Sequence, residues 1–305
     1  MEKERVLITV KTYPTLSRKY GETVCTAGVR EDGTWVRIYP VPFRRLNEEQ
    51  QYKKYDWLEV RLVRNTTDPR PETYRPFDSA DLEKPVGHMD TDDQWRERRK
   101  LLLKTARVYD RLDDLIAGAK ANQISLAVFK PTRITDFVWE EEERAWDPDK
   151  VREMRDATKQ YDLFADNTWR DTFKVIDKLP YSFSYKFEDT AGKKSELQVL
   201  DWEAGALYWN CLRSTNGDEP KALAKVRQKY FDEFTKKDLH FFLGTTQQFH
   251  FVAPNPWVII GVLALRVGAP GDVHASACRQ HAAVDGRLDP QWAPLHECVP
   301  SVGPR

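Results

Sequence analysis

An Asp-Gly pair between two β-prone runs is the feature that most limits how this chain can fold. Residues 23–29 and 34–39 flank Glu31, Asp32 and Gly33. A glycine takes a positive φ angle without steric cost, and a short Asp-Gly connection between β-prone runs is a strong hairpin signal. The pattern therefore predicts two antiparallel strands early in the chain.

Further β-prone runs surround this hairpin. Residues 6–10 are short and mostly apolar, and residues 56–65 alternate apolar and polar side chains. Such runs are typical of buried and half-buried strands. Residues 1–75 therefore predict a small β-barrel-like unit, since closure into a barrel hides the strand edges.

The rest of the chain predicts an α+β protein. Residues 76–178 form a mainly helical middle, with apolar side chains at helical spacing over residues 92–120. Residues 179–262 predict a mixed α/β layer, because Tyr181 to Phe187 alternate with period two and Asp201 is placed to cap a helix. The all-apolar run from Trp257 to Val262 is typical of a central strand.

The character of the sequence changes after residue 262. No lysine occurs from Asp238 to Arg305, and residues 263–305 are dense in Ala, Gly, Pro and His. The segment shows neither strand nor helix periodicity, so we expect an irregular tail. It is either a disordered tail or a frameshift read-through that follows a truncated last strand, and the second interpretation is favoured.

Bulk composition excludes several classes of protein. Lys and Arg total 48, as do Asp and Glu, so net charge gives no general attraction to a polyanion. Four scattered cysteines do not make a disulfide framework. The N-terminal apolar run is too short for a signal peptide, and no stretch reaches the length of a membrane span. We therefore expect a cytoplasmic protein with no membrane partner.

Three blocks of sequence carry a family resemblance. They are KTYPTLSRKYGETVCTAGVREDGTWVRIYPVPFR (residues 11–44), LQVLDWEAGALYWNCL (residues 197–212) and DLHFFLGTTQQFH…PNPWVIIGV (from residue 238). They resemble a family of uncharacterised bacterial proteins over residues 5–262. The resemblance implies no biochemical function, but it implies an association with bacterial mobile-element and defence genes. Some relatives carry a Cys and His cluster where residues 188–194 here contain neither.

The most distinctive candidate surface interleaves basic and aromatic residues. Trp35, Arg37 and Tyr39 share one face of their predicted strand. On the faces of small β-barrels, cations hold phosphates and aromatic rings stack on bases. The alternative is that the tyrosines pack the barrel and the cations are ordinary surface. The predicted nucleic-acid contacts are Lys11, Tyr13, Arg18, Lys19, Tyr20, Arg37, Tyr39, Arg44 and Arg45.

A second candidate is a pair of carboxylates, Asp201 and Glu203, after a predicted strand. Carboxylates at a strand end can hold Mg²⁺ for phosphodiester hydrolysis, and Mg²⁺ would be needed only in this case. However, the acid-x-Lys order of restriction-type nucleases is missing. Helix capping by Asp201 explains the pair more simply.

Two further groups of residues are weaker candidates for a site. The turn Gly244-Thr245-Thr246, with His240 and His250 nearby, could offer backbone N–H groups to an anion, although a tight turn is the simpler interpretation. The tail holds His274, Cys278, His281, His296 and Cys298, whose spacing matches no zinc module, so we assign no metal site.

The sequence therefore predicts a nucleic-acid-binding accessory protein, one that could sense a modified base, of a bacterial mobile-element or defence system. The first alternative is a metal-dependent nuclease centred on Asp201 and Glu203. The second is a non-catalytic subunit that binds a protein partner. Whether the chain is an enzyme stays open at this point.

Overall fold

The hairpin expected from the Asp-Gly pair forms the centre of the N-terminal sheet in the computed structural model, which describes residues 2–17, 21–46, 48–78, 81–153 and 175–267. Strands β3 (Gly21–Val29) and β4 (Trp35–Val41) pair antiparallel, with Val29 opposite Trp35. Gly33 has a φ angle of +82°, as the turn requires. Local turn chemistry thus sets this register.

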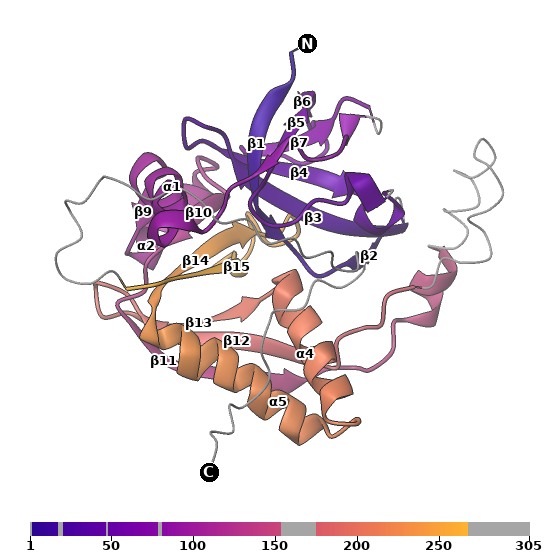
Figure 1. Cartoon of the computed structure of the whole chain (residues 1–305), viewed down its shortest axis with the longest axis vertical. Coiled ribbons are helices and arrows are strands. Elements are labelled where there is room, and N and C mark those ends of the chain that lie inside the picture. Colours follow the sequence, from indigo (N-terminus) through magenta and orange to yellow (C-terminus); the bar gives the residue numbers. More distant parts are fainter. Residues whose placement is uncertain (1, 18–20, 47, 79–80, 154–174, 268–305) are drawn as a thin grey trace, which may run out of the picture. The chain divides into compact units, whose positions relative to one another are not determined.

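The first sheet has the strand order β6-β7-β4-β3-β1-β5-β8, with β2 paired to β3. It is curled into a half-barrel (Figure 1). An apolar cluster that includes Val6, Ile8, Val36 and Ile38 fills its concave side. The remaining strands are β1 (Glu4–Lys11), β2 (Thr15–Ser17), β5 (Asp56–Val60), β6 (Leu62–Arg64), β7 (Thr73–Pro76) and β8 (Gly87–His88).

The helical pattern over residues 92–120 is interrupted in the structure. Helix α1 (Asp92–Arg99) continues as a π-helical turn, Lys100–Thr105, and α2 (Leu112–Lys120) begins afterwards. Between them, β9 (Val108–Tyr109) pairs in parallel with β10 (Leu126–Phe129). The prediction of a continuous helix was wrong because a β-prone Val-Tyr pair gains a strand partner.

The second sheet has the order β11-β12-β13-β15-β14-β10-β9. Its strands β9, β10 and β11 lie within the mainly helical middle; the sequence runs 124–129 and 134–139 predict β10 and β11 as strands, whereas β9 was not predicted. Strand β15 lies between β13 and β14, which confirms the prediction of a central strand, but it extends to Leu265 rather than Val262. The other strands are β11 (Arg133–Glu141), β12 (Tyr181–Glu188), β13 (Lys194–Val199), β14 (Asp238–Thr245) and β15 (Trp257–Leu265).

Helices α4 (Trp202–Ser214) and α5 (Glu219–Arg227) cover one face of the second sheet (Figure 1). The alternation of Phe183, Tyr185 and Phe187 places these rings in the apolar core between sheet and helices. The fold is therefore α+β, as predicted. No helix in the described part of the chain is long and apolar enough to cross a membrane.

The opposite face of the second sheet packs against the first sheet. Leu7 and Val10 of β1 share an apolar cluster with Phe242 and Ile260. Trp35 also contacts Phe242 edge to face, with ring centroids 5.8 Å apart. The convex face of the first sheet is consequently an interface, and the strand face predicted to meet nucleic acid is largely covered.

A candidate ligand pocket between the two sheets

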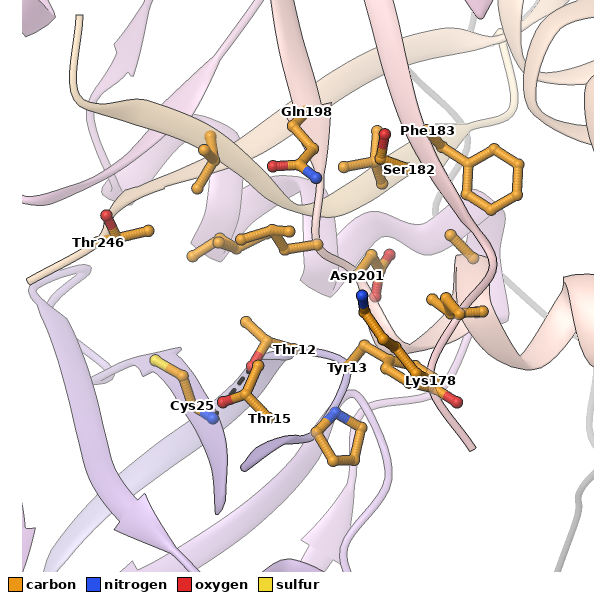
Figure 2. Close-up of a pocket in the computed structure, with 18 of the residues that line it drawn as sticks. Thr12, Tyr13, Thr15, Cys25, Lys178, Ser182, Phe183, Gln198, Asp201 and Thr246 are labelled. Atoms are coloured by element: carbon orange, nitrogen blue, oxygen red, sulfur yellow. Dashed lines mark hydrogen bonds between the residues drawn. The ribbon is translucent and has the colours of Figure 1, made fainter. Parts of the chain in front are cut away.

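Where the two sheets do not touch, they leave a partly open pocket of about 410 Å³ between them. Pockets that bind small ligands have volumes in this range. Figure 2 shows side chains of the first sheet and its loops facing side chains of the second sheet across this space. Lining residues include Thr12, Tyr13, Thr15, Cys25, Arg37, Tyr39, Trp146, Lys178, Tyr181, Ser182, Gln198, Asp201, Thr245 and Thr246.

Tyr13 is a fixed aromatic wall of the pocket. Its hydroxyl donates to the carbonyl of Asp177 at 2.9 Å and accepts from Nε1 of Trp209 at 2.9 Å. Burial raises the pKa of Tyr13 to about 12, so the phenol stays neutral. Its ring lies against Gly205, where an added Cβ would be 2.4 Å from the ring atom Cδ2. The glycine in α4 is thus explained by the close approach of Tyr13.

Trp146 contributes a second large aromatic side chain. It lies in the connection after β11 and is half-buried. Its Nε1 donates to the carbonyl of Ile176 at 2.7 Å, which fixes the indole. Tyr39 and Tyr181 also line the cavity. The pocket lining therefore includes several aromatic side chains, the residue type that stacks on planar ligands.

Arg37 is inside the protein rather than on its surface, and its exposed fraction is 1%. Its guanidinium donates to Oγ and the carbonyl of Ser125, at 2.7 and 3.0 Å, and to Oγ1 of Thr73 at 3.1 Å. The prediction that Arg37 is a surface phosphate contact is corrected accordingly. Because the second sheet covers this strand face, Arg37 joins the sheets and forms part of the pocket lining.

The Gly-Thr-Thr turn presents an acceptor instead of an anion site. The carbonyl of Thr245 accepts from Nη2 of Arg37 at 3.4 Å and from Nη1 of Arg70. Arg70 is in turn paired with Asp68. His250 bonds to Oγ1 of Thr245 at 2.9 Å, and burial lowers the pKa of its imidazole. The turn is held rigidly at one end of the pocket.

The carboxylates of the nuclease alternative are both bound to a lysine. Lys54 Nζ lies 2.9 Å from Oδ2 of Asp201 and 2.9 Å from Oε2 of Glu203. Asp201 also caps α4, accepting from the Glu203 amide at 3.2 Å, as the simpler interpretation expected. In the described ranges no cluster of three or more His, Cys, Asp or Glu side chains could hold a metal. This geometry favours a structural role for the pair.

Burial and ion pairing set the protonation states of Asp201 and Lys54. Burial raises the pKa of Asp201 to about 6, and the positive charge of Lys54 opposes that rise. Burial lowers the pKa of Lys54, but the charges of Asp201 and Glu203 outweigh this effect and raise it above its ordinary value. At neutral pH the buried ion pair is therefore charged on both sides.

The amine of Lys11 lies among aromatic rings. Its Nζ donates to the carbonyl of Tyr52 at 3.0 Å and lies 4.3 Å from the ring centroid of Phe43. The Trp202 ring lies 5.3 Å away. Burial lowers the pKa of Lys11 from 10.5 to about 8. Lys11 therefore belongs to the interior beside the pocket rather than to a phosphate-binding surface.

The buried amine of Lys11 predicts a pH dependence of stability. Between pH 8 and 10.5 the unfolded chain holds a proton on Lys11 that the folded protein has lost. The free energy of unfolding should therefore rise over this window, by about 2 to 3 kcal/mol from this group. Lys11→Met lacks the titrating group, so its stability advantage over the wild type should shrink by that amount. Urea denaturation of both proteins at several pH values measures this; a constant difference across the window would contradict it.

The predicted surface residues thus separate into groups. Tyr13, Arg37 and Tyr39 meet in the lining of one pocket, whereas Lys11 and Arg44 are not part of it. Arg44 pairs with Glu22 at 2.7 Å. Residues Arg18, Lys19 and Tyr20 and the side chain of Arg45 lie outside the described part of the structure, as do the tail residues His274, Cys278, His281, His296 and Cys298.

Several pocket residues were not singled out from the sequence. Ser182 and Gln198 occupy the polar positions of alternating strands, on the face opposite the aromatic core. Such positions are ordinarily solvent-facing, and their alternation alone does not reveal a second sheet above them. Trp146 and Lys178 lie in connections that carry no periodic signal. The polar residues at alternate positions of β12 and β13 were the available sequence signal for this wall of the pocket.

Comparison with known families matches two parts of the chain. Residues 2–104 match a domain of unknown function, DUF8758, and residues 108–283 match a domain of unknown function, DUF8757. A search of curated proteins finds no match. The pocket is lined from both matched parts, by Tyr13 and Tyr39 from the first and by Trp146 and Ser182 from the second. The second match covers more than half of the sequence, so the chain belongs to the DUF8757 family, which confirms the resemblance to an uncharacterised family.

Proposed function

We propose that this protein binds nucleic acid by receiving one unstacked base in the pocket between its sheets. The observation that carries the proposal is the joint lining of the pocket by aromatic rings and hydrogen-bonding side chains. Tyr13 and Trp146 supply rings held by their own hydrogen bonds, and Ser182, Gln198 and Thr246 supply polar groups. Proteins that read an extruded base stack it between rings and hydrogen-bond its edge.

The size of the pocket limits what enters it. A cavity of about 410 Å³ between two sheets admits a single base with its sugar, but not a duplex. The ligand strand must therefore be single-stranded or locally opened at that nucleotide. Small groups on a base change its fit in a pocket of this size, which is why a modified base remains part of the proposal.

The loop after β14 carries exposed apolar side chains that can contact the bases on either side of the inserted one. Thr246 lines the pocket, and Phe249, Phe251 and Val252 follow it with exposed fractions of 47%, 52% and 74%. The loop is anchored from within, because His250 bonds to Thr245 and to Asn122. Exposed rings on a fixed loop suit stacking with the bases that flank the inserted one.

The cellular setting belongs to the same proposal. We place the protein in the cytoplasm, as an accessory factor of a bacterial mobile-element or defence system. The nuclease alternative receives no support from the geometry, because Lys54 occupies both carboxylates.

Fluorescence anisotropy with labelled single-stranded oligonucleotides tests the proposal. We expect binding that weakens as salt concentration rises. Trp146→Ala should weaken it by about tenfold, since one base–aromatic stack is worth about 1 to 3 kcal/mol. Phe77→Ala is the matched control, because this exposed ring does not line the pocket. Absence of binding at low ionic strength, or equal losses in both variants, would refute the proposal.

A further inference from the structure

Two polar groups of the pocket lining have no partner within the protein. In the described residues, Nε of Arg37 and Oγ1 of Thr246 are buried and form no hydrogen bond. Both residues line the cavity, and Figure 2 shows Thr246 at its border. Buried polar groups are nearly always satisfied, so an unsatisfied pair at a cavity indicates that a ligand completes them.

The two groups belong to the same end of the pocket and cannot easily turn away. Arg37 reaches the carbonyl of Thr245, the neighbour of Thr246, at 3.4 Å. Its Nη1 donates to the hydroxyls of Ser125 and Thr73 and its Nη2 to the carbonyl of Ser125, which fixes the guanidinium plane. An N–H at Nε can only donate, and a threonine hydroxyl can donate as well. The matching atom on a ligand is therefore a hydrogen-bond acceptor.

The charges around Arg37 and Thr246 indicate whether the acceptor on the ligand is a charged phosphate or a neutral oxygen. Arg70 is paired with Asp68 at 2.5 Å. Arg37 donates to Oγ of Ser125, whose hydroxyl contacts the Glu72 carboxylate at 2.5 Å. Arg70 is thus paired directly with a carboxylate, and Arg37 is linked to one through the Ser125 hydroxyl. Since no excess positive charge is left for a phosphate, a neutral carbonyl oxygen fits best.

We infer that this end of the pocket selects a base that presents a carbonyl oxygen to Arg37 and Thr246. The inference rests on the proposed function and names the ligand class for the same site. Adenine lacks a carbonyl oxygen, whereas hypoxanthine differs from it by a carbonyl in place of the exocyclic amine. The pair therefore tests the contribution of that oxygen together with the change at N1, which accepts in adenine and donates in hypoxanthine, because a site with polar groups rejects a ligand that leaves them unpaired.

The test compares two short single strands, one all adenine and one with a single central hypoxanthine. We expect the wild-type protein to bind the hypoxanthine strand at least tenfold more tightly. Thr246→Val removes the hydroxyl at nearly constant volume, so it should weaken binding of the hypoxanthine strand more than binding of the adenine strand and reduce that ratio severalfold. Thr132→Val, an exposed position away from the pocket, is the control and should keep the full ratio.

Thr246 is the position to replace because Arg37 also joins the two sheets. Equal binding of the two strands, or an unchanged ratio in Thr246→Val, would overturn the inference while the proposed function stands. Failure to bind any strand, including mixed-sequence ones, would instead refute the proposed function. Thermal melting of each variant verifies that the fold is retained.

Discussion

Replacing Lys54 with methionine is expected to destabilise the protein by about 3 to 5 kcal/mol, which is the usual result of leaving a buried charge without its partner. The Lys54 side chain is 6% exposed and that of Asp201 is 0% exposed. Methionine fills a similar volume but removes the cation, so the Asp201 carboxylate stays buried and uncompensated. Glu203 contributes less, because its side chain is 43% exposed and can turn to solvent.

A second substitution separates lost charge from lost packing. Asparagine at position 201 is neutral and remains a good helix N-cap. The double variant Lys54→Met with Asp201→Asn should therefore recover a large part of the lost stability. Chemical denaturation of the wild type, both single variants and the double variant gives the coupling energy. A loss below about 1 kcal/mol in Lys54→Met would show that the pair is not buried as described.

The Asp201 case shows which features could be predicted from sequence. Its capping role depends on the next few residues, and the structure confirms it. Its ion pair with Lys54 joins residues 147 positions apart, and no local pattern connects them. The Asp-Gly hairpin could likewise be predicted from neighbouring residues, because the positive φ angle of Gly33 determines the turn.

Arg37 shows why the candidate surface was only partly predictable. The alternation of β4 correctly places Arg37 on the face opposite Val36 and Ile38. Whether that face meets water or another sheet depends on Ser125 and Thr245, which lie 88 and 208 positions further along the chain. The alternation of side chains along a strand does not show whether a face meets water or another sheet. The grouping of Tyr13, Arg37 and Tyr39 could therefore be anticipated, whereas the opposite wall of the pocket could not.

Gly205→Ala is expected to weaken nucleic-acid binding by at least tenfold with a small change in stability. The added Cβ would lie 2.4 Å from Cδ2 of the Tyr13 ring, a distance that forces the ring to move. Tyr13 is bonded to Trp209 and to the Asp177 carbonyl, so its displacement disturbs the wall of the pocket. Overpacking costs about 1 to 3 kcal/mol, and the better helix propensity of alanine offsets about 1 kcal/mol of it.

Two further variants make this result interpretable. Gly87→Ala is the matched control, since a Cβ there meets nothing within 4 Å. Tyr13→Leu in the Gly205→Ala background relieves the clash but removes the ring and its hydrogen bonds to Trp209 and Asp177, so it should not restore binding. Anisotropy titrations and thermal melts of the four proteins separate the two effects. If Gly205→Ala bound as tightly as the wild type, Tyr13 would not be a wall of the binding site, because a ring forced out of place cannot stack on a base as before.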